Sequence, residues 1–299
     1  MFRGLWGKLF IVVTVLLVTA IILGGSLWYQ LNATRMQLND TQAQLDATNR
    51  QLNDTQAQLN TIQPEMDSLK AEQSRMLSDY ANLKKQINLR LGIGQDAQGF
   101  ITPDDPEISA KVLEITEGYS EETDEFWRDY KRLFQWVVKT IEYSLDSPSP
   151  LLPESIGGTL EWVNDFWRLP VETIRDETGD CEDMAVLLTS MLLNYNQRKF
   201  DVWIIGIRTF GSTPKGHMAV AIPIEHRQLT ILDPASRYYT PFHTMGGVIG
   251  SREVTPAIDD WLARLNEEMR DAQVYVVFSE DFYQEFSTNE EFIDWMYRF

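Results

Sequence analysis

The sequence predicts an α+β domain that follows a transmembrane helix and a coiled coil. Residues 9–29 carry no charged side chain, residues 31–88 repeat with a period of seven, and strand-like alternation replaces helical periodicity from residue 200. Helices followed by a mainly antiparallel sheet are typical of the α+β class and not of a doubly wound fold. We expect four segments: a cytoplasmic tail at 1–8, a transmembrane helix at 9–29, a coiled-coil stalk at 31–90 and a folded domain at 100–299.

The composition excludes several classes of function. The 299 residues include 44 Asp and Glu against 26 Lys and Arg, a formal net charge of −18, so nucleic acid is repelled and no nucleic-acid partner is expected. The single cysteine, Cys181, forms neither an intramolecular disulfide nor a metal site built on several cysteines. No glycine-rich phosphate loop follows a predicted strand, so nucleotide binding has no support.

Residues 9–29 are typical of a membrane anchor. A helix of about 21 uncharged residues spans a hydrocarbon core of about 30 Å. Arg3 and Lys8 precede the segment and only Arg35 follows it closely, so the positive-inside rule predicts a cytoplasmic N-terminus and an extracytoplasmic domain at the cell membrane. The alternative is a cleaved signal peptide, whose apolar core is usually only about 7 to 15 residues long.

The stalk repeats a heptad that starts at Leu31. The stretch QLNDTQAQLDATNR at 37–50 is followed by the near copy QLNDTQAQLNTIQP at 51–64. This pattern predicts a coiled coil that acts as a spacer and joins the chain into a homo-oligomer. Threonine at four successive d positions weakens the first half of the seam, and Pro64 is expected to kink or interrupt the helix. The alternative is a lone polar linker.

Periodicity and helix breakers order the elements of the domain. Residues 121–145 and 184–193 are predicted helices, and residues 108–116 fit either a short helix or an extended segment. Prolines and glycines at 146–160 predict a long loop of the kind that borders a site. Strands are predicted at 200–209, 216–224, 228–233 and 273–279, and two later helices near 255–270 and 290–297.

Cys181 stands at the start of the most apolar predicted helix. Asp180 suits the N-cap and Asp183 follows three residues later, a capping-box-like arrangement that places Cys181 in the first turn. The unpaired N–H groups and the dipole of a helix N-terminus favour a thiolate, so we expect the pKa of Cys181 to lie below its usual ~8.5. The alternative is a small buried apolar side chain.

His217 and Asp233 are predicted to meet across a hairpin. His217 opens one predicted strand and Asp233 closes the next. A three-residue turn pairs Ile224 with Gln228, and the two polar residues are then diagonal neighbours about 7 to 8 Å apart at Cα, within side-chain reach. Cys, His and Asp at helix and strand ends supply a thiol, a base and an orienting carboxylate, the parts of nucleophilic acyl transfer.

Other residues near these strands have simpler expected roles. The alternate residues after His217 are Ala219 and Ala221, so we expect this small-residue face to contact the Cys181 helix. His226 lies in a charged turn and His243 in a loop, and both are expected to be solvated. The predicted nucleophile therefore has one candidate base, His217.

These motifs resemble the transglutaminase-like superfamily, whose papain-like core uses Cys, His and Asp in this order. The resemblance covers residues 108–236 and is most specific at Gly179-Asp180-Cys181-Glu182-Asp183, Gly216-His217 and Leu232-Asp233-Pro234. It implies Cys181 as nucleophile, His217 as general base and acid, and Asp233 as the residue that orients the imidazole. It further implies acyl transfer at an amide, which favours a thiol protease acting on peptide or isopeptide bonds near the membrane.

The resemblance also suggests a calcium site and a second oxyanion donor. Bacterial members that clip surface proteins carry the same Asp-Cys-Glu-Asp string and bind calcium through acids beside the cysteine, which makes Asp180 and Glu182 candidate calcium ligands. Trp162 or Trp167 is the candidate second oxyanion donor beside the backbone N–H of Cys181, although both also suit a core. A non-catalytic protein-binding domain and a transglutaminase proper are the alternative functions.

Overall fold

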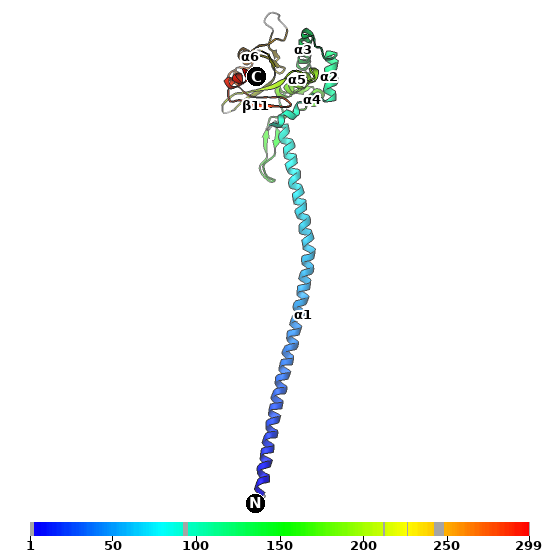
Figure 1. The fold of residues 1–299 in the computed structure, drawn as a ribbon, viewed down its shortest axis with the longest axis vertical. Helices are drawn as coiled ribbons and strands as arrows, with labels where there is room; N and C mark the ends of the chain where they lie inside the picture. Colours follow the sequence, from blue (N-terminus) through cyan, green and yellow to red (C-terminus); the bar gives the residue numbers. More distant parts are fainter. Residues whose placement is uncertain (1–2, 92–94, 212, 226, 242–247, 299) are drawn as a thin grey trace. The chain divides into compact units, whose positions relative to one another are not determined.

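The computed structural model describes residues 3–91, 95–211, 213–225, 227–241 and 248–298 (Figure 1). The chain divides into two units, Met1–Asp79 and Tyr80–Phe299, and each is described by itself. The long helix α1 (Arg3–Arg90) makes up the first unit, and its last turns belong to the second. All other elements lie in the second unit.

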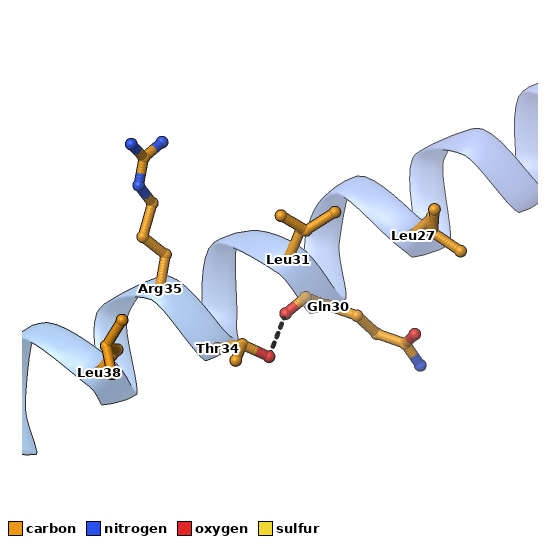
Figure 2. Close-up of a pocket in the computed structure, with 6 residues that line it drawn as sticks. All are labelled: Leu27, Gln30, Leu31, Thr34, Arg35 and Leu38. Atoms are coloured by element: carbon orange, nitrogen blue, oxygen red, sulfur yellow. Dashed lines mark hydrogen bonds between the residues drawn. The ribbon is translucent and has the colours of Figure 1, made fainter.

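The first unit is an exposed helix. Every side chain described in residues 7–79 is exposed. By length and composition, α1 is the one helix in the described part of the chain that could cross a membrane. Figure 2 shows Leu27, Leu31 and Leu38 projecting from its surface, on the border between the apolar segment and the heptad repeats.

The helix is continuous through the heptad repeats. Its d-position threonines each donate to the carbonyl oxygen four residues earlier, so their hydroxyls are satisfied without a second helix: Thr34, Thr41, Thr48 and Thr55. Pro64 lies inside α1, so the expected interruption is wrong; a proline removes one N–H from the ladder without ending this helix. Coiled-coil pairing of these repeats stays a prediction.

Helices form the first half of the second unit. They are α2 (Pro106–Thr116), α3 (Thr123–Thr140), α4 (Pro170–Asp176) and α5 (Cys181–Tyr195), with α6 (Val254–Leu262) and α7 (Asn289–Met296) later and short 3-10 helices at Gln95–Phe100 and Glu267–Met269. A helix is thus the outcome at 108–116, where the Asp105 side chain accepts from the N–H of Glu107 at the N-cap. The predicted helix at 255–270 is shorter, because it is divided between α6 and the second 3-10 helix.

The helix predicted at 121–145 also ends early, because α3 gives way to a strand. β1 (Glu142–Tyr143) pairs in parallel with β4 (Thr178–Gly179), directly before α5. The predicted loop at 146–160 contains β2 (Ser149–Leu151), which pairs with β3 (Glu161–Val163) as an antiparallel hairpin. These short pairings depend on contacts distant in sequence, which local periodicity does not report.

An antiparallel sheet forms the second half of the unit. Its strands are β5 (Trp203–Arg208), β6 (Gly216–Ile224), β7 (Gln228–Asp233), β8 (Tyr238–Tyr239), β9 (Arg252–Glu253), β10 (Gln273–Phe278) and β11 (Tyr283–Glu285). Their order is β11-β10-β5-β6-β7-β8, with β9 on β7. Ile224 pairs with Gln228, so the predicted hairpin register is confirmed.

The two faces of the sheet carry two separate cores. On one face, Val220 and Ile222 of β6 share a core with the buried helix α5. On the other face, Ala219 and Ala221 share a core with Trp261 of α6 and with α7. The expectation that the small-residue face contacts the Cys181 helix is therefore wrong; the small residues instead make room for large rings on the opposite side.

Candidate active site

A strand-to-helix turn places Cys181 at the first position of α5. The chain arrives through β4, where Gly179 pairs with Tyr143 of β1. A Cβ at Gly179 would lie 2.7 Å from the Cβ of Asp183, closer than side chains approach. Glycine therefore lets the strand turn sharply into the helix, and the thiol is held at the helix N-terminus as predicted.

The two acids expected to cap this helix have other partners. Asp180 occupies the N-cap, but its side chain makes no capping bond. Asp183 accepts from the backbone N–H of Arg168 at 2.7 Å and pairs with the Arg168 guanidinium. The expected capping box is therefore wrong, because Asp183 instead holds the segment that precedes α4.

His217 and Asp233 are in direct contact. The Nε2 atom of His217 lies 2.7 Å from Oδ2 of Asp233, which also accepts from Nε1–H of Trp261 at 2.8 Å. The other oxygen, Oδ1, accepts from the backbone N–H of Ser236 at 2.9 Å. Burial raises the pKa of Asp233, but His217, Ser236 and Trp261 outweigh it and hold that pKa below its usual value. The carboxylate is thus fixed in position and ionised.

Cys181 and His217 line the same cavity of about 460 Å³. Polar or aromatic side chains make up much of the remaining wall: Tyr143, Asn164, Asp165, Trp167, Asp180, Glu182, Tyr275, Phe278 and Tyr283. Among the described residues, no lysine or arginine lines this cavity. The structure therefore brings together Cys181, His217 and, through His217, Asp233, while His226 and His243 lie outside the described residues.

The two tryptophans proposed as oxyanion donors lie in different places. Trp167 is buried in the cavity wall, where it packs against Phe278. Trp162 lies on β3 with 62% of its surface exposed and is not part of the cavity wall. The structure thus brings one of the two candidates to the site.

Three buried carboxylates gather beside Cys181. Oxygen atoms of Asp146, Asp180 and Glu182 lie within 4.8 Å of one another, and Oδ1 of Asp180 is buried with no hydrogen-bond partner. Burial, reinforced by the carboxylates of Asp183 and Asp146, raises the pKa of Asp180 to about 7. Burial and Asp180 likewise raise the pKa of Glu182. Sequence analysis found two of these acids and missed Asp146, whose one signal is its place at the start of the predicted site-bordering loop.

The same charges act on the thiol. Burial and the carboxylates of Glu182 and Asp180 raise the pKa of Cys181, and the thiol donates to Oε2 of Glu182 at 3.2 Å. The backbone N–H of Met218 donates to the sulfur and opposes this rise. The expected lowering of the Cys181 pKa is therefore wrong for this arrangement of charges, because two adjacent acids and burial outweigh the helix N-terminus.

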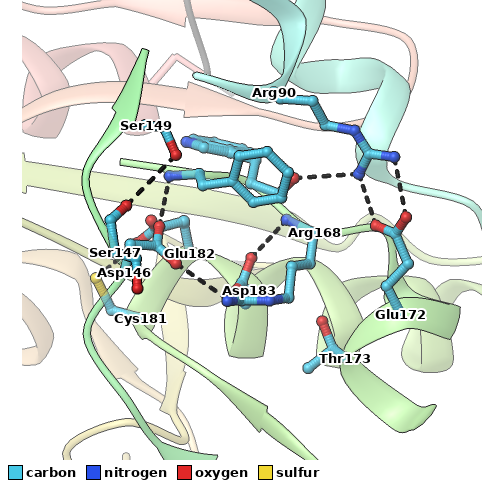
Figure 3. A network of polar contacts seen from close by, with 12 residues as sticks. Arg90, Asp146, Ser147, Ser149, Arg168, Glu172, Thr173, Cys181, Glu182 and Asp183 are labelled. Atoms are coloured by element: carbon cyan, nitrogen blue, oxygen red, sulfur yellow. Dashed lines mark hydrogen bonds and ion pairs between the residues drawn. The ribbon is translucent and has the colours of Figure 1, made fainter. Parts of the chain in front are cut away.

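A network of arginines holds the acidic wall in place (Figure 3). Arg168 donates to Oδ1 of Asp146 at 3.1 Å and pairs with Asp183, and the backbone N–H of Phe166 donates to Oδ2 of Asp146. Arg90, in the last turn of α1, forms a two-point pair with Glu172 at 2.6 and 3.0 Å. Its backbone carbonyl accepts from the N–H of Trp167 at 2.6 Å. The segment that carries Arg168 is therefore fixed at both ends.

The comparisons with known proteins agree with the resemblance. Residues 111–246 match the family model described as a transglutaminase-like domain. No curated protein matches the chain.

Similar solved structures include Legionella pneumophila LapG in two states. The EGTA-treated form is 18% identical, with a TM-score of 0.31, over 60% of this chain and 86% of that one. The calcium-bound form is 16% identical, with a TM-score of 0.29, over 64% and 97%. A candidate cysteine protease from Cytophaga hutchinsonii is 12% identical, with a TM-score of 0.30, over 65% of this chain and 54% of that one.

Proposed function

We propose that the chain is a thiol hydrolase, a cysteine protease that cleaves peptide or isopeptide amide bonds through Cys181, His217 and Asp233. The observation that carries this proposal is the 2.7 Å contact between His217 and Asp233 on the wall of the cavity that Cys181 also lines. A thiol at a helix start, beside an imidazole oriented by an ionised carboxylate, is suited to nucleophilic attack on an amide.

We infer a step of the reaction for each residue from its contacts. Asp233 binds Nε2–H of His217, which leaves Nδ1 to take the proton of the Cys181 thiol. The sulfur then forms a bond to the carbonyl carbon, and the backbone N–H of Cys181 donates to the developing oxyanion. The imidazolium returns its proton to the leaving nitrogen as the C–N bond breaks. His217 next deprotonates a water, which hydrolyses the thioester and restores the thiol.

Calcium fits the acidic wall of the same cavity. Asp146, Asp180 and Glu182 offer clustered, buried carboxylate oxygens, which are the ligands calcium prefers, and the unpartnered Oδ1 of Asp180 gives an oxygen free to bind it. When bound there, the cation would supply positive charge beside Cys181. We include this site in the proposal, with Arg168 and Phe166 holding Asp146 in position.

The first unit is proposed to anchor and pair the chain. The uncharged segment at 9–29 and the flanking Arg3 and Lys8 support an N-terminus in the cytoplasm and a domain outside it. Protease added to intact spheroplasts should remove residues 100–299, and full protection would refute this topology. The exposed heptad leucines support pairing with a second copy. A detergent-solubilised full chain that is monomeric by light scattering would leave only a spacer.

The catalytic proposal is tested with the full chain in detergent and a library of peptide and isopeptide substrates. Cys181→Ala should abolish cleavage and leave the fold intact, because it removes one sulfur from a helix that tolerates alanine. Iodoacetamide should label wild-type Cys181 faster than in His217→Ala, where no base takes the proton. Equal labelling, with partner binding that survives both substitutions, would favour the binding-domain alternative. Amine incorporation that exceeds hydrolysis would favour a transglutaminase proper.

A further inference from the structure

A second cavity lies against the active site. It has a volume of about 370 Å³ and shares Tyr143 with the cavity that holds Cys181. Its wall is built from the end of α3 and the start of β1, from Met184 one turn after Cys181, and from the turn after Asp233: Val138, Lys139, Thr140, Ile141, Glu142, Tyr143, Met184, Pro234, Ala235 and Arg237. Met184 lies one turn after Cys181, and Pro234 follows Asp233 directly, so the groove is built on the same elements as the proposed triad.

The groove carries two cations in its wall, Lys139 and Arg237. Lys139 and Arg237 are exposed, and within the described residues neither forms an ion pair or a side-chain hydrogen bond. One acid, Glu142, shares the wall, so cations are in excess there. Most other arginines of the domain have carboxylate partners: Arg90, Arg128, Arg132, Arg168, Arg175, Arg198 and Arg252. The chain as a whole has a net charge of −18, so this groove differs in charge from most of the protein.

The backbone of the turn fixes Arg237 relative to the triad. Arg237 has a φ of 57°, in the left-handed region that glycine or asparagine usually occupies. Its N–H donates to the carbonyl of Pro234 at 3.3 Å, and the neighbouring Ser236 N–H donates to Asp233. The carboxylate that orients His217 therefore also orders the turn that presents Arg237.

We propose that this groove binds an acidic side chain of the polypeptide substrate, with Lys139 and Arg237 pairing with its carboxylate. The inference rests on the proposed protease function and names a substrate class for it. The cavity that shares Tyr143 with this groove has no lysine or arginine in its wall among the described residues, so the cations that a substrate acid can pair with lie on the groove side. Because the groove shares Tyr143 with the cavity that Cys181 lines, we expect the acid at a position close to the scissile bond.

The test compares synthetic peptide libraries that are identical except for Glu, Gln or Lys at each position within three residues of a randomised centre. For wild-type protein we expect kcat/KM to be about three- to tenfold higher for Glu than for Gln at one position, and lowest for Lys, with the preference reduced at high salt. Arg237→Gln should bring kcat/KM for Glu peptides close to that for Gln peptides, whereas Arg237→Lys should keep the preference. Arg264→Gln, at an exposed cation outside the groove, is the matched control.

The outcomes separate this inference from the function on which it rests. Equal cleavage of Glu and Gln peptides by wild-type protein, or an unchanged preference in Arg237→Gln, overturns the groove and leaves the protease intact. If wild-type protein cleaves no peptide, the proposed protease function is wrong. The proposal about the groove is then tested by peptide binding. The Cys181→Ala variant should then bind Glu peptides more tightly than Gln peptides by fluorescence polarisation. Arg237→Gln should remove that difference, and its persistence would overturn the proposal.

Discussion

Cys181 lies between two groups of buried carboxylates whose pKa values move in opposite directions. Asp233 accepts from His217, Trp261 and Ser236, and its pKa is lowered in spite of burial. Asp180 and Glu182 face other acids, and their pKa values are raised. Burial is common to both groups, so the difference comes from the donors aimed at each carboxylate. The protein's own hydrogen-bond donors satisfy the Asp233 carboxylate. The oxygens of Asp180 and Glu182 lie among other carboxylates and are suited to bind a cation.

The largest expected effect is on turnover and comes from substitution of Asp233, the carboxylate that accepts several hydrogen bonds. Asp233→Asn keeps the shape of the side chain but leaves the imidazole in the wrong tautomer, so turnover should fall by about 10⁴-fold with little change in substrate binding. The measurement is kcat and KM on the best library peptide. Trp261→Phe, which removes one of the donors to Asp233 and keeps His217, is the control and should cost far less. A loss below tenfold in Asp233→Asn would mean that this pair does not orient a base.

The next effect concerns the arginine that holds the acidic wall. Arg168→Ala leaves Asp146 and Asp183 buried without their cation, which should destabilise the domain by about 3 to 5 kcal/mol. Urea unfolding of the full chain, followed by tryptophan fluorescence, measures this loss. Lys131→Ala, at a half-buried cation away from this wall, provides a comparison and should change stability by much less. If both variants lose the same free energy of unfolding, the ion pairs of Arg168 with Asp146 and Asp183 contribute no more to stability than the contacts of Lys131.

Calcium should stabilise the folded protein by binding at Asp180 and Glu182 and not at Asp233. At a calcium concentration about a hundred times its Kd, binding stabilises the folded state by about 2.7 kcal/mol, which raises Tm by roughly 5 to 10 °C in a domain of this size. The rise should disappear with EGTA and in Asp180→Asn, and should persist in Asp233→Asn. A calcium response that survives in Asp180→Asn would place the ion elsewhere.

The smallest effect is a pH dependence at Asp233. Because the pKa of Asp233 is lower in the folded state than its unfolded value of 3.8, its ionised form stabilises the fold above about pH 4. That contribution is lost as the pH falls through the folded pKa. The stability advantage of wild-type protein over Asp233→Asn should therefore shrink below pH 4 in urea unfolding at each pH. A constant advantage down to pH 2 would contradict the lowered pKa.

The parts of the fold that the sequence predicted well are those set by local pattern. β6 and β7 begin and end at the predicted residues because a short turn fixes their register, and this register brings His217 to Asp233. The start of α5 was also predicted, because Asp180 occupies the N-cap as expected, although its side chain makes no capping bond. A transglutaminase-like domain follows from the same motifs.

The parts that were missed depend on contacts between distant segments. Asp146 reaches Asp180 because β1 pairs with β4, a contact that no local period reports. The raised pKa of Cys181 has the same origin, since it comes from burial and from acids whose other partners were unknown. Which face of β6 meets α5 also could not be read from small residues alone, because α6 competes for the same sheet. The coiled coil and the membrane topology stay predictions, since they concern partners outside a single chain.

The contacts between Arg90 and the segment at Trp167 have a consequence for proteolysis of the chain. Arg90 belongs to the helix that is proposed to continue into the membrane, yet its guanidinium and carbonyl hold the segment that carries Arg168. A proteolytic cut before Tyr80 would release the second unit with Arg90 still paired with Glu172. A cut between Arg90 and residue 100 would release a fragment without Arg90. The site of cleavage would therefore decide whether the segment that carries Arg168 keeps its contacts with Arg90.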